Sequence, residues 1–186
     1  MNWLLLPLLL TQASPTEGWS VVEREDASPD LRPLPLGAGH PFDAPSSPAH
    51  HALIQAEQLL ASLEGQALTP SDNPSYDARL EYAQRALKTA DTIAITLKEC
   101  ATDQSLEPLC RIRAADANRL AAGVLDQVPP PVGAQPKAHR AHIAEIQAPM
   151  WATARQAYTL VEGNPAANPA WRAHARWALT QLPESK

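Results

Sequence analysis

The sequence has few of the residues from which β-sheets are usually built. Its 186 residues include one Phe and three Tyr, and Ala and Leu outnumber the β-branched residues. Aromatic and β-branched side chains favour strands, whereas Ala and Leu favour helices. The composition therefore predicts an all-α domain.

Motifs that bind cofactors or activate a nucleophile are also missing. The chain contains no G-x-S-x-G turn, phosphate-binding loop, dinucleotide fingerprint or C-x-x-C pair. Each of these motifs supplies one functional part of an active or binding site, such as an exposed nucleophile or a loop that binds phosphate. We therefore expect no enzyme activity and no cofactor.

Long apolar runs and an excess of basic residues are lacking as well. A membrane-spanning helix needs about 20 apolar residues, and no stretch of the chain approaches that length. The 15 basic and 20 acidic residues give a net charge of −5, which disfavours binding to nucleic acid or to an anionic membrane. We expect the partner to be another envelope or secreted protein.

The first thirteen residues are typical of a secretory signal peptide. Residues 3–10 form an apolar run of the right length, and small residues follow that suit cleavage after Ala13. An N-terminal helix packed on the domain is the alternative. If residues 1–13 are a signal peptide, the protein is exported and is periplasmic or extracellular.

Residues 14–48 are rich in proline and acidic residues, with seven prolines, six acidic and two basic residues. Such a stretch buries too little apolar surface to offset its ordering entropy. It predicts a disordered tether that precedes a domain at residues 49–183. Residues 31–37, LRPLPLG, have the pattern of polyproline ligands that dock in aromatic grooves, and a plain linker is the other interpretation.

Helix start signals recur along residues 49–183. Ser47-Pro48, Asn73-Pro74, Ser105 and Asn168-Pro169 each combine an N-cap residue with a proline or an acidic first turn. Apolar residues then recur at steps of three and four. Helices are expected at residues 48–65, 74–101, 106–128, 136–163 and 169–183, with Pro149 kinking or dividing the fourth.

Long helices joined by short loops favour antiparallel neighbours. We therefore predict an up-and-down antiparallel helical bundle of four to five helices. The starts of the last four predicted helices lie about 32 residues apart, which makes a tetratricopeptide-like helical array the alternative.

The only two cysteines, Cys100 and Cys110, fall at the end of one predicted helix and the beginning of the next. An antiparallel helical hairpin would bring these two turns together. In an oxidising compartment, such a pair forms a disulfide. We predict a Cys100–Cys110 bond that joins the two helices at the tip of the hairpin.

A metal site is one candidate function. His139, His142 and Glu145 recur at steps of three on one helix, and these ligand types suit Zn²⁺ or Cu²⁺. His50, His51 or His174 would complete the coordination. An ordinary solvated helix face is the other interpretation of these residues.

An aromatic and basic patch in the last third of the chain is the second candidate. Arginine on indole faces can bind a partner, although tryptophans that cover the end of an Ala-rich core would look the same. We expect an exported, non-catalytic interaction or scaffold protein of the cell envelope, with a periplasmic metal-binding protein as the alternative. The predicted partner-binding residues are Trp151, Arg155, Trp171, Arg172, Arg176 and Trp177.

Overall fold

A computed structural model describes residues 34–37, 47–68 and 75–184 of the chain. Within these residues the structure is entirely helical, so the predicted all-α bundle is confirmed. The predicted signal peptide and most of the predicted tether lie outside the described residues. The five helices are α1 (Pro48–Leu68), α2 (Tyr76–Cys100), α3 (Glu107–Leu125), α4 (Pro136–Glu162) and α5 (Pro169–Thr180).

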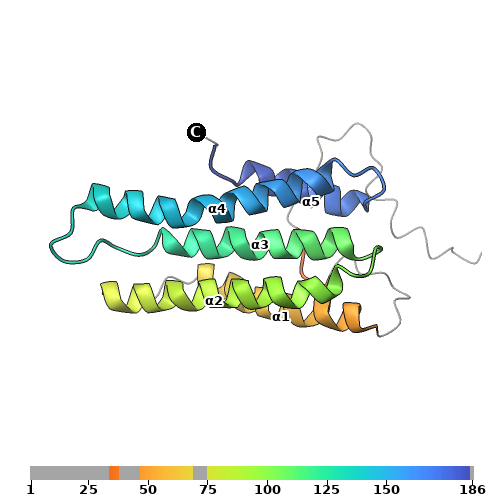
Figure 1. Ribbon diagram of the computed structural model, residues 1–186, viewed down its shortest axis with the longest axis horizontal. Coiled ribbons are helices and arrows are strands. Elements are labelled where there is room, and N and C mark those ends of the chain that lie inside the picture. Colours follow the sequence, from red (N-terminus) through yellow and green to blue (C-terminus); the bar gives the residue numbers. More distant parts are fainter. Residues whose placement is uncertain (1–33, 38–46, 69–74, 185–186) are drawn as a thin grey trace, which may run out of the picture.

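Helix α3 lies at the centre of the bundle. Figure 1 shows α1 and α2 on one side of α3, and α4 and α5 on the other, and α3 packs against all four. A helix that is surrounded in this way is buried over most of its circumference, and a stripe through Glu107, Arg111, Ala114 and Asn118 stays partly exposed. The polar residues Arg113 and Asp116 of α3 are therefore buried together with its apolar ones.

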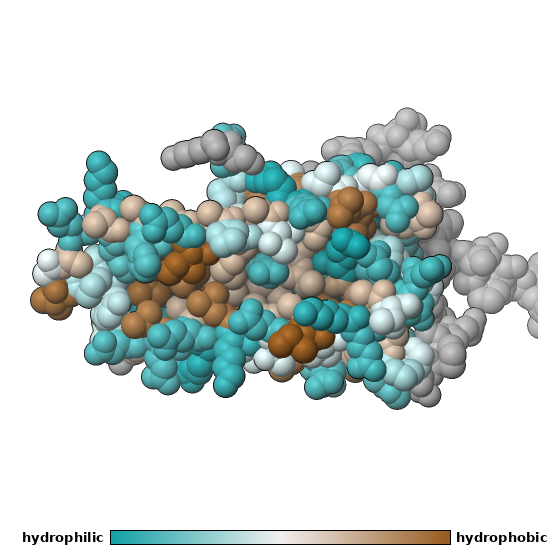
Figure 2. All heavy atoms as spheres, viewed as in Figure 1, coloured by the Kyte–Doolittle hydropathy of each residue, from teal (hydrophilic) through white to brown (hydrophobic). Residues whose placement is uncertain are grey.

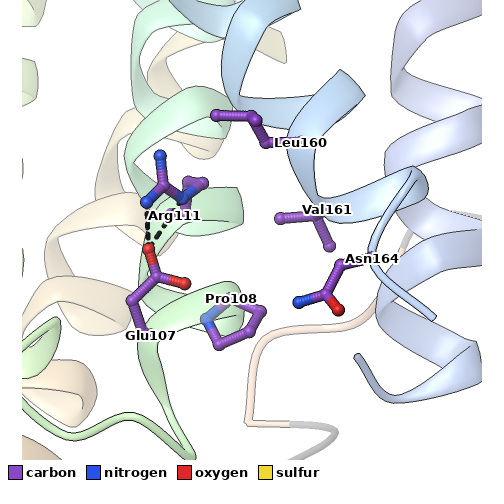
Figure 3. A pocket seen from close by; sticks show the side chains of 6 residues that line it. All are labelled: Glu107, Pro108, Arg111, Leu160, Val161 and Asn164. Carbon is purple, nitrogen blue, oxygen red and sulfur yellow. Dashed lines mark hydrogen bonds and ion pairs between the residues drawn. The ribbon is translucent and has the colours of Figure 1, made fainter. Parts of the chain in front are cut away.

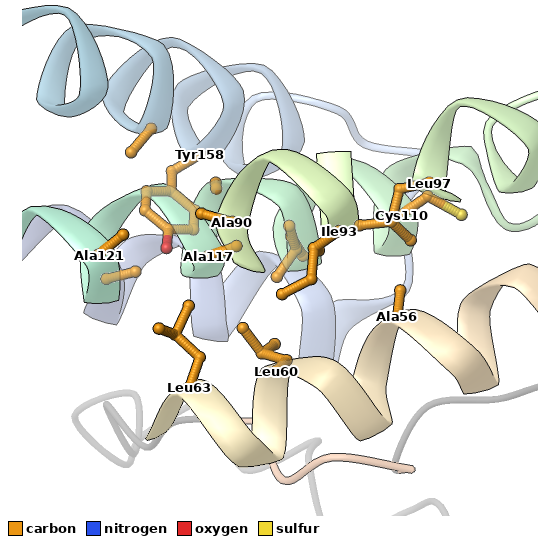
Figure 4. Packing of buried hydrophobic residues seen from close by; sticks show 14 of the residues in the cluster. Ala56, Leu60, Leu63, Ala90, Ile93, Leu97, Cys110, Ala117, Ala121 and Tyr158 are labelled. Atoms are coloured by element: carbon orange, nitrogen blue, oxygen red, sulfur yellow. The ribbon is translucent and has the colours of Figure 1, made fainter. Parts of the chain in front are cut away.

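Alanine allows the helices around α3 to pack closely. The buried residues of α2 alternate in steps of three and four, and four of the six are Ala or Cys. In Figure 4, Leu60 and Leu63 of α1 and Tyr158 of α4 point from opposite sides toward the small side chains of Ala117 and Ala121. The pattern of apolar residues at steps of three and four in α2 also includes Leu80, Leu87 and Ala94, which are only half-buried. The buried positions of α2 are Ala83, Ala86, Ala90, Ile93, Leu97 and Cys100.

The predicted side-chain caps of α1 and α5 are present at Ser47 and Asn168, and Ser47 Oγ accepts a hydrogen bond from His50 N at 3.1 Å. Ser75 Oγ accepts a hydrogen bond from Ala78 N at 3.3 Å, so the cap of α2 lies two residues after the predicted Asn73. Asn168 Oδ1 accepts from Ala170 N at 2.8 Å, as predicted for α5. Each cap satisfies one of the backbone N–H groups that a helix leaves without a partner.

Ser105, in contrast, does not cap α3, and that prediction is wrong. The residue before α3 is Leu106, which makes no side-chain cap. Both the backbone N–H and the hydroxyl of Ser105 donate to Asp103 Oδ1, at 2.8 and 2.6 Å. An aspartate two residues earlier competes for the same groups by forming a local turn, and this turn leads the chain into α3.

Pro149 does not divide α4, which is a single helix from Pro136 to Glu162. Pro149 is exposed, and so is Glu145, whose carbonyl loses its helical partner at the proline. A carbonyl on the solvent side of a helix can bind water instead. The solvent-facing position of the proline explains why the helix continues.

The predicted disulfide joins the end of α2 to the first turn of α3. Cys100 and Cys110 are bonded, with their Cα atoms 6.0 Å apart. Both side chains are buried in the core. The bond therefore links the two helices at the loop end of their hairpin, as predicted.

The face that carries α2 and α4 shows an apolar band between these two helices (Figure 2), bordered by hydrophilic side chains. Half-buried Leu87, Leu120, Ile146 and Met150 belong to the outer layer of the core. None of the helices in the described ranges is long and apolar enough to cross a membrane.

Candidate functional site

Five polar residues from four helices meet in the interior beside α3. We call Glu57, Arg113, Asp116, Tyr158 and His174 the Arg113 cluster. Charged side chains are rarely fully buried unless they are paired, yet Arg113 is only 1% exposed. The cluster therefore requires partners for every charge, and the structure provides them.

Arg113 is the centre of the cluster. Its Nε donates to Glu57 Oε1 of α1 at 2.8 Å, and its Nη1 lies 3.4 Å from Asp116 Oδ2, one turn along α3. The two remaining directions of the guanidinium are filled by main-chain carbonyl oxygens, which belong to segment 34–37. Nη1 donates to Leu34 O at 3.1 Å and Nη2 to Pro35 O at 2.8 Å.

Asp116 connects α3 to α4 and α5. Its Oδ1 accepts a hydrogen bond from the Tyr158 hydroxyl at 2.7 Å and lies 2.9 Å from His174 Nε2. His174 Nδ1 accepts the backbone N–H of Leu34 at 2.7 Å. Because an N–H can only donate, Nδ1 carries no proton, and we assign the ring proton to Nε2, which donates to Asp116.

The surroundings lower the pKa of Asp116 and raise the pKa values of Tyr158 and Glu64. Burial alone would raise the pKa of Asp116, but the hydrogen bond from His174 and the charges of Arg119 and Arg113 hold it below its usual value. Burial and the adjacent Asp116 carboxylate raise the pKa of Tyr158 well above its usual value. Burial and the charge of Asp116 also raise the pKa of Glu64, which lies on α1 at the margin of the cluster.

Segment 34–37 is held chiefly through its main chain. Besides the bonds to Arg113 and His174, the N–H of Gly37 donates to Glu57 Oε2 at 2.9 Å. The Leu34 and Leu36 side chains are half-buried and pack against the core, whereas Pro35 and Gly37 are exposed. The orange segment in Figure 1 lies beside α3 and reaches toward α1.

These contacts change the interpretation of residues 31–37. The described part of this stretch docks on the bundle, so for these residues the docking interpretation describes the structure better than the plain linker. The surface that holds it is an ion-pair cluster and not an aromatic groove. Gly37 has φ +77°, a conformation that side chains other than glycine rarely adopt.

The predicted metal ligands are not brought together. His139 Nε2 lies 3.0 Å from the Val128 carbonyl oxygen, while His142 and Glu145 form an exposed pair 3.8 Å apart. His174 belongs to the Arg113 cluster. Across the described residues, no three His, Cys, Asp or Glu side chains are grouped so that they could hold a metal ion.

The predicted aromatic and basic patch is largely occupied by contacts within the chain. Trp171 is only 6% exposed, and the Trp177 ring lies under the guanidinium of Arg119 at 5.3 Å. Arg176 Nε lies 3.0 Å from Glu162 Oε1. The residues of the patch therefore join α5 to its neighbouring helices.

The other arginines of the patch bind backbone carbonyls. Arg172 Nε donates to Glu162 O at 3.2 Å, and Arg155 donates to Pro183 O. Trp151 is half-buried on α4. Arg172 and Arg176 therefore both contact Glu162 at the end of α4, and only Arg155 binds elsewhere.

A separate hollow of about 260 Å³ lies between the beginning of α3 and the end of α4. Figure 3 shows an ion pair of Glu107 and Arg111 on one side and Leu160 and Val161 on the other. The ion pair satisfies the charges of the hollow. The hollow therefore offers no unpaired charged group to a ligand.

Sequence reasoning did not identify the Arg113 cluster, although a signal was present. The predicted buried stripe of the third helix passes from Cys110 to Ala117, and Arg113 occupies the intermediate position of the same stripe. His174 lies in the same way between Trp171 and Ala178 on the last helix. A polar residue on an otherwise apolar stripe is the pattern to look for.

The fold and the cluster together define a helical bundle that holds a short non-helical segment of its own chain. Comparison with protein-family models found no match, and searches of curated proteins and of solved structures also found none.

Proposed function

We propose that this chain is an exported, non-catalytic interaction protein of the cell envelope, and that its binding site is the Arg113 cluster. The observation that carries the proposal is that the buried polar groups of the cluster face the main chain of residues 34–37. Arg113, Glu57 and His174 direct donors and acceptors at the main chain of a short segment that ends in a turn. Groups arranged in this way can bind a polypeptide backbone, and this binding requires no reaction of the polypeptide.

The protonation of the cluster supports binding over catalysis. Both ring nitrogens of His174 are engaged. The pKa of Asp116 is lowered and the pKa of Tyr158 is raised, so these two shifts move away from neutrality. A general acid or base is most efficient when its pKa lies near the working pH.

Two features support export. The first thirteen residues have the pattern of a signal peptide, and the chain carries a buried disulfide. Structural disulfides persist mainly in oxidising compartments. The aromatic and basic patch is not the site that we propose, because Trp171 is buried and the three arginines are engaged within the chain.

Export is tested by the non-reducing intact mass of the native protein. We expect a chain that begins at Ser14 and is lighter by two hydrogen atoms because of the disulfide. A mass that includes residues 1–13 would contradict export.

Binding is tested by photo-crosslinking in the native compartment. A photoreactive residue at Ile54, which is exposed on α1 one turn before Glu57, should crosslink a discrete polypeptide. The matched control is Ile95, an exposed isoleucine on α2. Equal crosslinking from both positions, or none from Ile54, would contradict the proposed binding site.

A further inference from the structure

We infer that the Arg113 cluster also takes a segment of another protein in place of residues 34–37. The ligand class is a short stretch with the pattern hydrophobic, Pro, hydrophobic, Gly that turns at its last two residues, as residues 36 and 37 do. The chain's own segment is then an internal competitor for the site. This inference rests on the proposed function and adds to it the chemistry of the partner.

The main-chain contacts define what the site recognises at each position. The first residue of the ligand must donate its N–H to His174 Nδ1, and its carbonyl oxygen must accept a hydrogen bond from Arg113. The second must offer a carbonyl to Arg113, and the fourth must donate an N–H to Glu57. All of these groups belong to the backbone, so a different polypeptide can supply them equally well.

The surroundings of each position restrict which residues the ligand can carry there. Leu34 and Leu36, in the first and third positions, are half-buried against the core, which favours apolar residues there. The second position needs no N–H, and proline restricts the free chain to an extended form, which lowers the entropy lost on binding. The fourth position has φ +77°, which favours glycine.

The site also requires an occupant. If segment 34–37 left, the Arg113 guanidinium would lose two carbonyl acceptors, and Glu57 and His174 would each lose an N–H donor. Buried polar groups without partners are destabilising. A polypeptide with the same backbone pattern restores all four bonds, whereas a side-chain ligand restores only some of them.

The chain's own segment is suited to exchange. It is held by non-covalent contacts, and its second and fourth residues are exposed. Only residues 38–46 separate it from the residue before α1. A ligand tethered so closely has a high effective concentration, in the millimolar range for short flexible linkers, so a free peptide binds weakly until the internal segment is removed.

The test uses the full chain and a labelled peptide of residues 32–38, Arg-Pro-Leu-Pro-Leu-Gly-Ala. The open variant carries Leu34→Pro and Gly37→Pro, which remove the two N–H donors of the internal segment without changing the bundle. Fluorescence anisotropy should show at least tenfold tighter binding to the open variant than to the unsubstituted chain. Gly37→Ala is a second opening variant, in case the double variant does not fold.

Matched peptides test the mode of recognition without altering the protein. Replacing the glycine by N-methylglycine removes only the N–H that meets Glu57, and the loss of a hydrogen bond to a charged group should weaken binding by about tenfold or more. A scrambled peptide with the order Pro-Gly-Leu-Leu serves as the composition control. Equal binding of the three peptides would overturn the inference.

Hydrogen exchange of residues 34–37 verifies that the internal segment is released in the opening variant. Absence of peptide binding to a folded, released variant at millimolar peptide would overturn the inference, and crosslinking from Ile54 would then still support the proposed function. A stable complex between the open variant and the unsubstituted chain would assign the ligand to a second copy and overturn its assignment to a different protein.

Discussion

Replacing Arg113 by methionine tests whether the Arg113 cluster holds the bundle together. Met matches the length of the arginine stem but removes the charge and all of the donors. Glu57 then loses its ion pair with Arg113, and Asp116 keeps only its pair with Arg119 at 3.9 Å. Removing one partner of a buried ion pair typically costs about 3–5 kcal/mol, because the charge that remains is uncompensated.

Arg111→Met is the matched control in the same helix. Arg111 pairs with Glu107 one turn away, and its side chain is 41% exposed. Exposed pairs at this spacing contribute about 0.3–0.5 kcal/mol. The two substitutions remove the same side chain, so the difference of roughly 3 kcal/mol or more between them measures the effect of burial and partners.

Urea unfolding followed by circular dichroism at pH 7 measures both free energies of unfolding. We expect a much lower midpoint for Arg113→Met at an unchanged slope, and almost no change for Arg111→Met. A loss below about 1 kcal/mol for Arg113→Met would refute the reasoning, because it would place the cluster within the range of surface ion pairs.

Three further predictions concern the disulfide and the partners of Asp116. Cys100→Ser should lower the free energy of unfolding by about 2–3 kcal/mol while helicity persists; equal thermal midpoints with and without reductant would contradict this. Tyr158→Phe removes a hydrogen bond to a buried carboxylate and should cost about 1.5–3 kcal/mol, measured by urea unfolding; an unchanged midpoint would show that the bond contributes nothing. Because the pKa of Asp116 is lowered on folding, its contribution is present above the unfolded value of about 3.8 and is lost as the pH falls through the folded value. Asp116→Asn should therefore flatten the acid side of the stability profile relative to the unsubstituted chain, and parallel profiles would count against the assigned charge state.

Most of the secondary structure could be predicted because it depends on local patterns. Apolar steps of three and four residues, with a cap and a proline at the start, indicated all five helices. The prediction for Ser105 was wrong because a neighbouring residue decides the outcome, and contact with solvent decides that Pro149 does not divide α4. Asp103 takes the donors of Ser105, and the exposed position of Pro149 keeps α4 continuous.

The disulfide could be predicted from the sequence because it depends on the hairpin, which is nearly a local feature. Cys100 and Cys110 are ten positions apart and become neighbours once two antiparallel helices meet. The metal and patch hypotheses depended instead on residue type. His139 lies beside a backbone carbonyl, and Trp171 belongs to the core, so residue type alone did not reveal their contacts.

The Arg113 cluster combines residues from segments far apart in the chain. Arg113 and Glu57 are 56 positions apart, and Asp116 and His174 are 58 positions apart. Their contacts depend on the position of α3 between α1 and α5, which no local pattern specifies. The sequence by itself determined the all-α class, the helices and the cysteine pair, because these follow from local periodicity and short-range chain geometry. Only the tertiary structure decided that an arginine, two carboxylates, a tyrosine and a histidine would share one buried site and hold residues 34–37, because burial brings distant charges together and requires each of them to find a partner.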